Sequence, residues 1–312
     1  MQREQTTVAR RWALVLAGGD GARLQGLTRS ITGVPMPKQY CRILGNHSLL
    51  EATLLRIRNW IPRRRTLVVV TRSHLSIARD QLAQLPTGNV LVQPRNCDTG
   101  PGLLFSLLHL ASKDPKAHVA LFPSDHYVGN ERVFIDHVRR ATALLRRFPD
   151  KIILLGIRPD HCALGYGYVE PAHPLSLAPG AAAAFHVGAF QEKPDAEAAD
   201  ALLRRGGLWN SFVMVFRLQR LLELLQQEVP LEFAQMQAAF SEPTRAEDHY
   251  RDLAPWNFSR RFLSHVPQHL AVLPVEGAHW SDWGTPEAIQ FTLQRLNQAP
   301  PSWARHLVPA AG

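Results

Sequence analysis

Short apolar runs alternate with helical patterns along most of the chain that follows Trp12. Five of these runs are almost continuously apolar, as expected for buried strands: WALVLA, TLVVVT, VLVQ, HVALFP and KIILLGI. The segments between them predict helices near 48–59, 75–84, 102–112 and 131–147. The first of these helices opens with Ser48 and Glu51, which have the spacing of a capping box. Strands that alternate with helices in this way indicate repeated βα units and an α/β fold.

The pattern changes after Gly165. Three further strand-like segments follow with longer connections, namely GYGYVE, AAAFHVGAF and LWNSFVMVF, and helices are predicted near 195–205 and 217–227. The Ala-rich stretch 181–184 is expected to be a loop or the lead-in to a strand. From Leu270 the chain predicts a strand, a turn at WSDWGTP and a closing helix near 286–296. We therefore expect a second lobe with a more mixed sheet.

Composition narrows the class of protein. The chain has 312 residues, of which 46% are hydrophobic and 20% are charged, so it can bury a substantial core. No apolar run approaches the roughly 20 residues that span a bilayer, and the start MQREQTTVARR has no apolar signal region. We expect a cytoplasmic location and no membrane partner. Cys41, Cys97 and Cys162 are odd in number and far apart, which favours ordinary thiols.

The formal charge of +9 favours an anionic partner. Nucleic acid is one such partner, but the arginines are scattered along the chain. The densest cluster, Arg63–Arg65, lies between a predicted helix and a predicted strand, where a solvated loop is the better interpretation. We therefore expect no nucleic-acid partner.

The segment LAGGDGARL directly follows the first predicted strand. Gly18, Gly19 and Gly21 remove side chains where the backbone could approach a phosphate, and Arg23 could add a guanidinium to the same site. A glycine turn after a strand is also a common structural feature, so this segment alone leaves a tight turn and a nucleotide site equally open. It matches neither the dinucleotide fingerprint nor a P-loop.

Several other polar residues follow apolar or proline-rich segments of the chain. Lys38 follows two prolines in VPMPKQY and is either a second phosphate ligand or a surface lysine. Asp125 follows the strand HVALFP, and a carboxylate at that sheet edge suits Mg²⁺, although a turn or helix cap is the alternative. The neighbouring His126 is better interpreted as a turn histidine. Asp282 is a further polar group flanked by apolar residues, and if it shares a crevice with Asp125, the strand predicted from Leu270 and the strand HVALFP must present their carboxyl ends to the same place.

Three polar residues in the second lobe, Glu192, Lys193 and Asn210, are each flanked by apolar strand residues. Such groups are costly to bury unless they pair with one another or bind a ligand. Tryptophans and tyrosines nearby are better interpreted as core or pocket wall.

The order of motifs resembles one known family. LAGGDGARL, PKQ, QPRNCDTGP, FPSDH, GYGYVE, EKP, WNS and WSDWGTP occur in the order found in sugar-phosphate nucleotidyltransferases, and most closely in mannose-1-phosphate guanylyltransferases. The resemblance extends from about residue 13 to 290. It implies a Rossmann-like fold with a mixed central sheet. The implied organisation is a tail over 1–10, one domain over 11–298 and a tail over 299–312, with a nucleotide-binding half near 11–160 and a sugar-binding half near 161–298.

The resemblance also implies roles for individual residues. The triphosphate would be held by the glycine loop and two cations, namely Leu16, Ala17, Gly18, Gly19, Gly21, Arg23 and Lys38. The base would face Gln93, Thr99, Gly100 and Pro101, and Asp125 with Asp282 would share Mg²⁺. The sugar side would comprise Asp125, Gly167, Glu192, Lys193 and Asn210, with Lys193 at the sugar phosphate. The implied catalytic set is Arg23, Lys38, Asp125, Lys193 and Asp282.

The implied reaction joins GTP and mannose-1-phosphate to give GDP-mannose and pyrophosphate. The ionised sugar phosphate attacks the α-phosphorus in line, so positioning and charge neutralisation dominate. Several positions depart from the usual family pattern: Gly26, Met36, Phe212 after WNS, and CDTGP in place of Asn-Thr-Ala-Pro. Alternatives are dTTP or UTP with glucose-1-phosphate, and an inactive sugar-nucleotide sensor. A homo-oligomer is possible, and with 16 residues after residue 296 no added isomerase or β-helix domain is expected.

Overall fold

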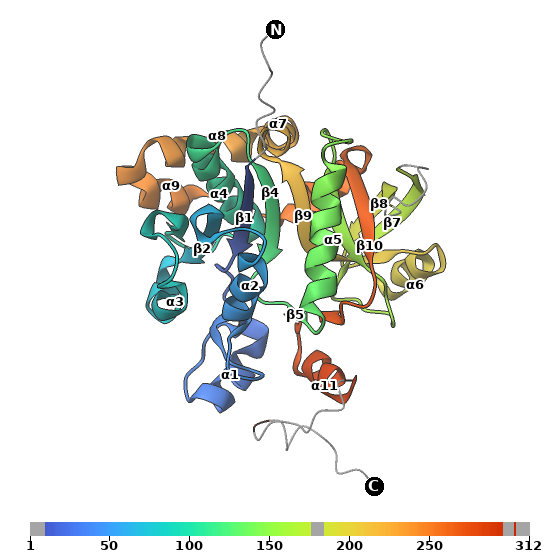
Figure 1. Cartoon of the computed structure of the whole chain (residues 1–312). Coiled ribbons are helices and arrows are strands. Elements are labelled where there is room, and N and C mark those ends of the chain that lie inside the picture. The colour runs from blue at the N-terminus through green and yellow to red at the C-terminus, as the bar shows by residue number, and fades with distance from the viewer. Residues whose placement is uncertain (1–9, 176–183, 296–302, 304–312) are drawn as a thin grey trace.

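The computed structural model describes residues 10–175, 184–295 and 303. Nine strands in this part of the chain form one sheet in the order β3-β2-β1-β4-β9-β6-β10-β8-β7 (Figure 1). The strands of this sheet are β1 (Arg11–Leu16), β2 (Thr66–Thr71), β3 (Val90–Gln93), β4 (His118–Pro123), β6 (Ile152–Ile157), β7 (Gly167–Pro174), β8 (Phe185–Glu192), β9 (Leu208–Arg217) and β10 (Leu270–Val275). A separate two-stranded sheet pairs β5 (Tyr127–Val128) with β11 (Trp280–Ser281).

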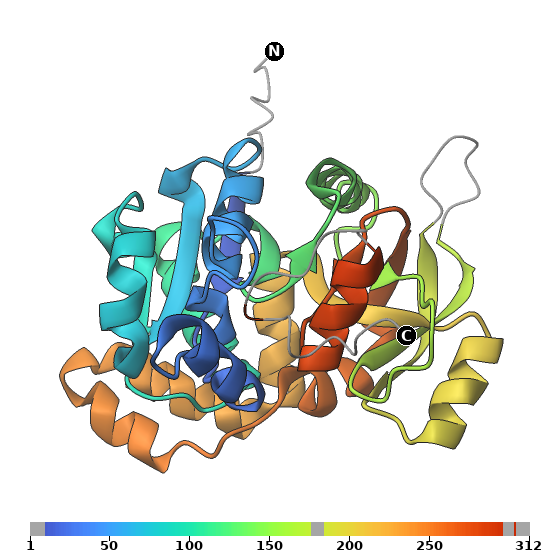
Figure 2. The same ribbon diagram turned by 90° about the horizontal axis from the view of Figure 1, so that it is seen from below.

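Helices cover both faces of the large sheet. The helices of the described residues are α1 (Gln25–Thr32), α2 (Leu49–Arg58), α3 (Leu75–Leu82), α4 (Thr99–Lys113), α5 (Glu131–Leu144), α6 (Ala196–Arg204), α7 (Leu218–Glu228), α8 (Pro230–Ser241), α9 (Ala246–Asp252), α10 (Phe258–Arg261) and α11 (Pro286–Arg295). Of these, α1 and α11 belong instead to a separate hydrophobic cluster that includes Trp283. The faces divide by the alternation of side chains along each strand. On β1, Leu14 belongs to the cluster that also includes residues of α4, α7 and α8, whereas Ala13 and Val15 belong to the cluster that includes residues of α2, α3, α5 and α6. The result is a three-layer α/β/α arrangement, which Figure 2 shows from below.

The sheet is mixed, as expected. Strands β3, β2, β1 and β4 are parallel, and so are β6 and β10. The long strand β9 lies antiparallel between β4 and β6 and thereby joins the two parallel groups. Because β6 precedes residue 160 and pairs with strands that follow it, the two expected halves share one continuous sheet.

The predicted elements agree with the structure within a few residues at most ends. The capping box at Ser48 and Glu51 is present, with both hydrogen bonds formed. Helices α1, α8, α9 and α10 and the small β5–β11 sheet were not predicted. The Ala-rich stretch 181–184 and both expected tails lie almost entirely outside the described residues.

Candidate active site

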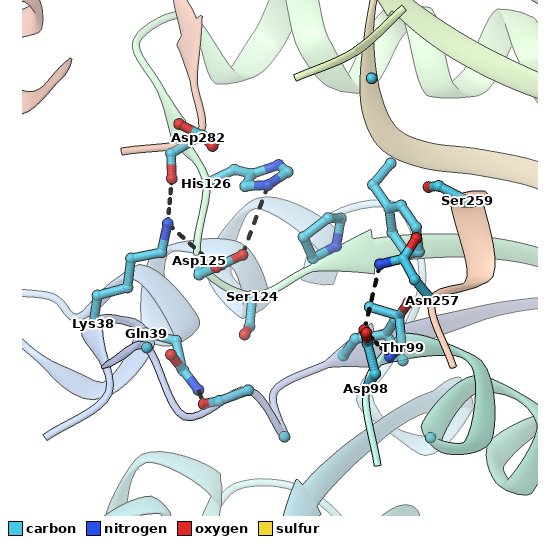
Figure 3. Close-up of a pocket in the computed structure, with 18 of the residues that line it drawn as sticks. Lys38, Gln39, Asp98, Thr99, Ser124, Asp125, His126, Asn257, Ser259 and Asp282 are labelled. Carbon is cyan, nitrogen blue, oxygen red and sulfur yellow. Dashed lines mark hydrogen bonds and ion pairs between the residues drawn. The ribbon is translucent and has the colours of Figure 1, made fainter. Parts of the chain in front are cut away.

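A cavity of about 620 Å³ opens beside the carboxyl ends of β1 and β4. Its walls come from the first glycine loop, the segments after β3 and β4, the ends of β7, β8 and β9, and the segments before α10 and α11. Figure 3 shows Lys38, Asp125 and Asp282 on one side of this cavity and Thr99 and Asn257 on the other. Leu16 and Asp282 are 282 − 16 = 266 positions apart in sequence, and both line this cavity.

The glycine loop is shaped by the segment that carries Lys38. The Gln39 amide donates to the carbonyl of Gly19 at 2.7 Å, and the Tyr40 hydroxyl donates to that of Ala17 at 2.6 Å. Gly21 has φ +59°, and a Cβ there would lie 3.1 Å from the Lys38 backbone nitrogen. Glycine is required because the conformation is left-handed and the neighbouring backbone is close.

The predicted phosphate-side residues are largely brought together. Leu16, Gly18, Gly19, Gly21, Arg23 and Lys38 all line the cavity. Ala17 is buried behind them, and its backbone joins the loop to β2 through a 2.9 Å hydrogen bond with Val69. Arg23 is exposed, and its guanidinium has no hydrogen-bond or ion-pair partner among the residues that the structure describes.

Lys38 is not a surface lysine. Only 7% of it is exposed, and its ammonium lies 3.3 Å from Asp125 Oδ2. The same ammonium donates to the backbone carbonyls of Asp282 and Trp283, the latter at 3.1 Å. Lys38 therefore bridges the two segments that carry the predicted metal-binding aspartates, as Figure 3 shows.

The two aspartates converge by a route that differs from the expectation. Asp282 does not follow the long strand directly, because β10 ends at Val275 and the chain turns before the short strand β11. Strand β11 pairs antiparallel with β5, with Ser281 opposite Tyr127. Since β5 begins two residues after Asp125, this small sheet brings Asp282 to the same end of the cavity.

Charge around Asp125 favours its ionised form. Burial favours the neutral acid, but the charge of the Lys38 ammonium outweighs it and holds the pKa of Asp125 below its usual value. Burial lowers the pKa of His126, and its Nδ1 accepts from the Trp280 indole at 3.2 Å. The resulting Nε2 tautomer faces Asp125 Oδ1 at 3.7 Å. His126 is therefore a neutral neighbour of the carboxylate that is held in place by Trp280.

Gln93 sits at the base of the opposite wall. Its amide nitrogen lies 3.2 Å from Thr71 Oγ1, whose single proton is donated to the carbonyl of Gly18 at 2.7 Å. This arrangement fixes the amide, and the buried Oε1 accepts no hydrogen bond from any residue that the structure describes. A Cβ at Gly18 would meet Gln93 Nε2 at 2.4 Å, so the glycine makes room for the side chain.

The expected base-facing segment divides into two kinds of residue. Thr99 lines the cavity, and so does Gly102, which was not predicted. Gly100 and Pro101 are buried and do not line it. A Cβ at Gly100 would lie 2.2 Å from the Trp256 ring, so this glycine serves packing in the structure.

The predicted sugar-side residues lie together on β7, β8 and β9. Gly167 pairs with Glu192 across β7 and β8, and a Cβ at Gly167 would meet Glu192 Oε2 at 2.6 Å. Burial raises the pKa of Glu192. Lys193 has φ +49° and is exposed beside it, and Asn210 lies on β9 with its Oδ1 accepting from the Phe212 backbone at 3.0 Å. Gly167, Glu192, Lys193 and Asn210 all line the cavity.

Several lining residues were missed from the sequence. Pro255 and Asn257 come from the segment that leads into α10, Ser259 lies in α10, and Tyr166 and Phe212 also line the cavity. Phe212 has φ +57°, a left-handed backbone conformation that favours glycine over residues with a side chain. The departure of Phe212 from the family pattern after WNS was visible in the sequence. The segment PWNFS, residues 255–259, contains no charged residue that would mark it as part of a site.

The oxygen ligands at the Lys38 end fit a magnesium ion. Asp125 and Asp282 both line the cavity and supply carboxylates, which hard divalent cations prefer. Among the described residues there is no group of three or more His, Cys, Asp and Glu side chains arranged to hold a metal. Mg²⁺ is usually bound by one or two carboxylates together with substrate phosphates and water.

The chain belongs to the nucleotidyl transferase family, whose model matches residues 12–298. Curated relatives include a mannose-1-phosphate guanylyltransferase from Salmonella typhimurium, 34% identical over 226 residues, and a second such protein from Escherichia coli O157:H7 at 31%. Each match covers 70% of this chain and 45% of the relative. The chain thus spans about half the length of these curated relatives.

Solved structures confirm the fold. A Thermus thermophilus protein described as a mannose-1-phosphate geranyltransferase superposes with a TM-score of 0.79 at 26% identity, covering 93% of this chain and 80% of that one. The expected Rossmann-like α/β fold with a mixed sheet is therefore correct. Among the described residues, no helix is both long and apolar enough to cross a membrane.

Proposed function

We propose that this protein transfers the nucleotidyl group of GTP to mannose-1-phosphate, forming GDP-mannose and releasing pyrophosphate. One observation carries the proposal: the described structure gathers Arg23, Lys38, Asp125, Lys193 and Asp282 around a single cavity. These residues are far apart in sequence, and together they provide cations and carboxylates for two phosphorylated substrates. The relatives named mannose-1-phosphate guanylyltransferases support the choice of substrates.

The phosphate end of the site performs neutralisation and positioning. The glycine loop offers its backbone to the triphosphate, and Arg23 is free to fold onto it because no described residue engages its guanidinium. Lys38 lowers the repulsion between the incoming sugar phosphate and the triphosphate. The sugar phosphate is already ionised, so no general base is required and the reactants need only be held in line.

Asp125 and Asp282 hold Mg²⁺ in this proposal. The ion supplies electrostatic stabilisation of phosphate oxygens and a template for their orientation. Lys38 keeps Asp125 ionised and fixes the Asp282 backbone, so both carboxylates are prepared before substrates bind.

Polar groups that line the cavity support the assignment of the base and sugar ends. The buried Gln93 Oε1 is an acceptor that a base N–H can satisfy, and guanine presents such donors on its Watson–Crick edge. On the sugar side, the Glu192 carboxylate accepts hydrogen bonds from sugar hydroxyls, and the Asn210 side-chain amide donates to them. Lys193 binds the sugar phosphate. A cytoplasmic location, expected from the sequence, stays part of this proposal.

A substrate panel tests the assignment. GTP, UTP, dTTP and ATP are each combined with mannose-1-phosphate and with glucose-1-phosphate, and pyrophosphate release is measured. The proposal predicts the highest kcat/KM for GTP with mannose-1-phosphate. A preference for dTTP or UTP with glucose-1-phosphate would show that the assignment of GTP and mannose-1-phosphate is wrong. If no pair releases pyrophosphate, the result would favour an inactive sugar-nucleotide sensor.

A further inference from the structure

One segment joins the two ends of the cavity that bind different substrates in the proposed function. Residues 250–259, here named the strap, lie against residues 95–100, which precede and begin α4. The Arg95 guanidinium donates to three strap carbonyls, those of Tyr250 at 2.8 Å, Arg251 at 3.1 Å and Leu253 at 2.8 Å. An arginine fork that binds three carbonyls fixes the direction of the strap.

Backbone hydrogen bonds continue this attachment toward the cavity. Trp256 donates its N–H to the carbonyl of Cys97 at 3.3 Å and accepts from Gly100 at 3.0 Å. The next residue along the strap, Asn257, donates its side-chain amide to Asp98 Oδ1 at 3.4 Å, and the Phe258 N–H donates to Thr99 Oγ1 at 2.9 Å. The two segments therefore form one unit over this stretch, as Figure 3 shows for Asp98, Thr99 and Asn257.

The Trp256 ring occupies the space that a side chain at position 100 would need. A Cβ at Gly100 would lie 2.2 to 2.4 Å from three ring carbons, which is closer than any ordinary contact. The ring cannot yield easily, because Trp256 is held by its backbone on both sides and packs against the buried core. Gly100 and Trp256 thus form a size-matched pair.

The strap ends on the sugar side of the cavity. Asn257 and Ser259 line the cavity together with Glu192, and the nearby Ser259 hydroxyl opposes the effect of burial on the pKa of the Glu192 carboxyl. On the other side of the Trp256 contact, Asp98 and Thr99 line the base side. A shift of the strap would therefore move groups at both substrate sites while leaving Lys38, Asp125 and Asp282 in place.

We propose that the strap is a positioning element of the binding site and that Trp256, seated against Gly100, is the positioning residue that fixes the base-side and sugar-side walls relative to each other. This inference rests on the proposed function. It assigns Ser259 the role of orienting Glu192, and it predicts that disturbing the Gly100–Trp256 pair weakens the binding of both substrates more than it slows chemistry.

A double-mutant cycle tests the pair. Gly100→Ala and Trp256→Ala should each raise the KM for GTP and for mannose-1-phosphate by about tenfold, with kcat reduced by no more than about threefold, because misplaced binding walls cost affinity first. Adding Gly100→Ala to Trp256→Ala should change KM by less than about twofold, since the clash requires the ring. Additive effects, or equal losses in kcat, would overturn the inference.

Serine variants supply a second, non-disruptive test. Ser259→Ala should raise the KM for mannose-1-phosphate by about fivefold and leave that for GTP unchanged, and Ser259→Thr should restore part of the loss. Ser264→Ala, which removes an exposed hydroxyl bonded to the Arg260 carbonyl, is the matched control. An unchanged KM in Ser259→Ala would contradict the sugar-side role.

Calorimetric titration separates this inference from the proposed function. If the wild-type protein binds neither GTP nor mannose-1-phosphate, the proposed function fails and the inference fails with it. If the wild type binds both and Gly100→Ala and Trp256→Ala bind them equally well, only the inference is wrong.

Discussion

At the scale of single residues, the site depends on cations with very different surroundings. Lys38 is buried and tied to Asp125 and to two carbonyls, whereas Arg23 and Lys193 are exposed. A buried, fully engaged cation organises its neighbours, and an exposed cation is available to a ligand. We therefore expect the two exposed cations to contribute to substrate binding and turnover and little to stability.

Lys193→Ala should raise the KM for sugar phosphate by about ten- to hundredfold and change the KM for nucleotide by less than about threefold, because one charge-assisted contact is lost at one substrate. Steady-state kinetics with each substrate varied in turn provides the measurement. Lys116→Ala removes another exposed lysine outside the cavity and serves as the control. Equal effects on both KM values would count against the assignment of Lys193.

Arg23→Ala should lower kcat by about 10²-fold, since a donor aimed at developing charge on the triphosphate is removed. The melting temperature should stay within about 1 °C, because an exposed surface side chain contributes little to stability. Arg29→Ala, an exposed arginine on α1, should leave both quantities unchanged. A variant of Arg23 that fails to fold would mean that this arginine is structural and that the glycine loop needs another interpretation.

At the scale of elements, the sequence predicted those helices and strands that have a pattern of their own in the chain. Strands such as β2 are apolar at nearly every position because both faces are covered, and the helix at α2 carries its own capping box. In contrast, β5 and β11 are two residues long and exist only because they pair with each other. The route of Asp282 into the site depends on that pairing, so the sequence predicted its proximity to Asp125 through the family resemblance and misjudged the strand that carries it.

The capping box gives a stability prediction that is independent of the site. Ser48 is fully buried, accepts from the Glu51 N–H at 3.1 Å and donates to Gln81 at 2.6 Å. Ser48→Ala should therefore lower the free energy of unfolding by about 1–2 kcal/mol without altering either KM. Denaturant unfolding of this variant and of Ser112→Ala, an exposed helical serine, makes the comparison. A loss in Ser48→Ala no larger than that of the control would show that the cap contributes nothing.

At the scale of the whole molecule, the cavity exists because distant segments meet over one sheet. The cavity residues on β strands and at their ends could be predicted from the sequence, because polar side chains such as Glu192 and Asn210 interrupt apolar patterns. Asn257 and Ser259 were not, because the strap reaches the cavity only through its contacts with residues 95–100. Tertiary contacts of this kind leave no periodic signal in the chain.

The shared-metal arrangement predicts strong coupling between two residues 157 positions apart, since 282 − 125 = 157. Asp125→Asn and Asp282→Asn should each lower kcat/KM by about 10²-fold or more, and the double variant should lose far less than the product of the two, because residues that serve one ion act as a unit. Thorough chelation with EDTA should abolish wild-type activity, and added Mg²⁺ should restore it. Activity undiminished by chelation would show that the protein does not need a metal ion.

The most direct test of nucleotidyl transfer follows the α-phosphate itself. GTP labelled at the α-phosphate is incubated with mannose-1-phosphate and Mg²⁺, in parallel with GTP labelled at the γ-phosphate, and the products are separated by chromatography. The α-label should move into GDP-mannose and the γ-label into pyrophosphate, in equal amounts, and both transfers should be lost in Asp125→Asn. Release of the γ-label as inorganic phosphate, or an α-label that never joins the sugar, would contradict nucleotidyl transfer.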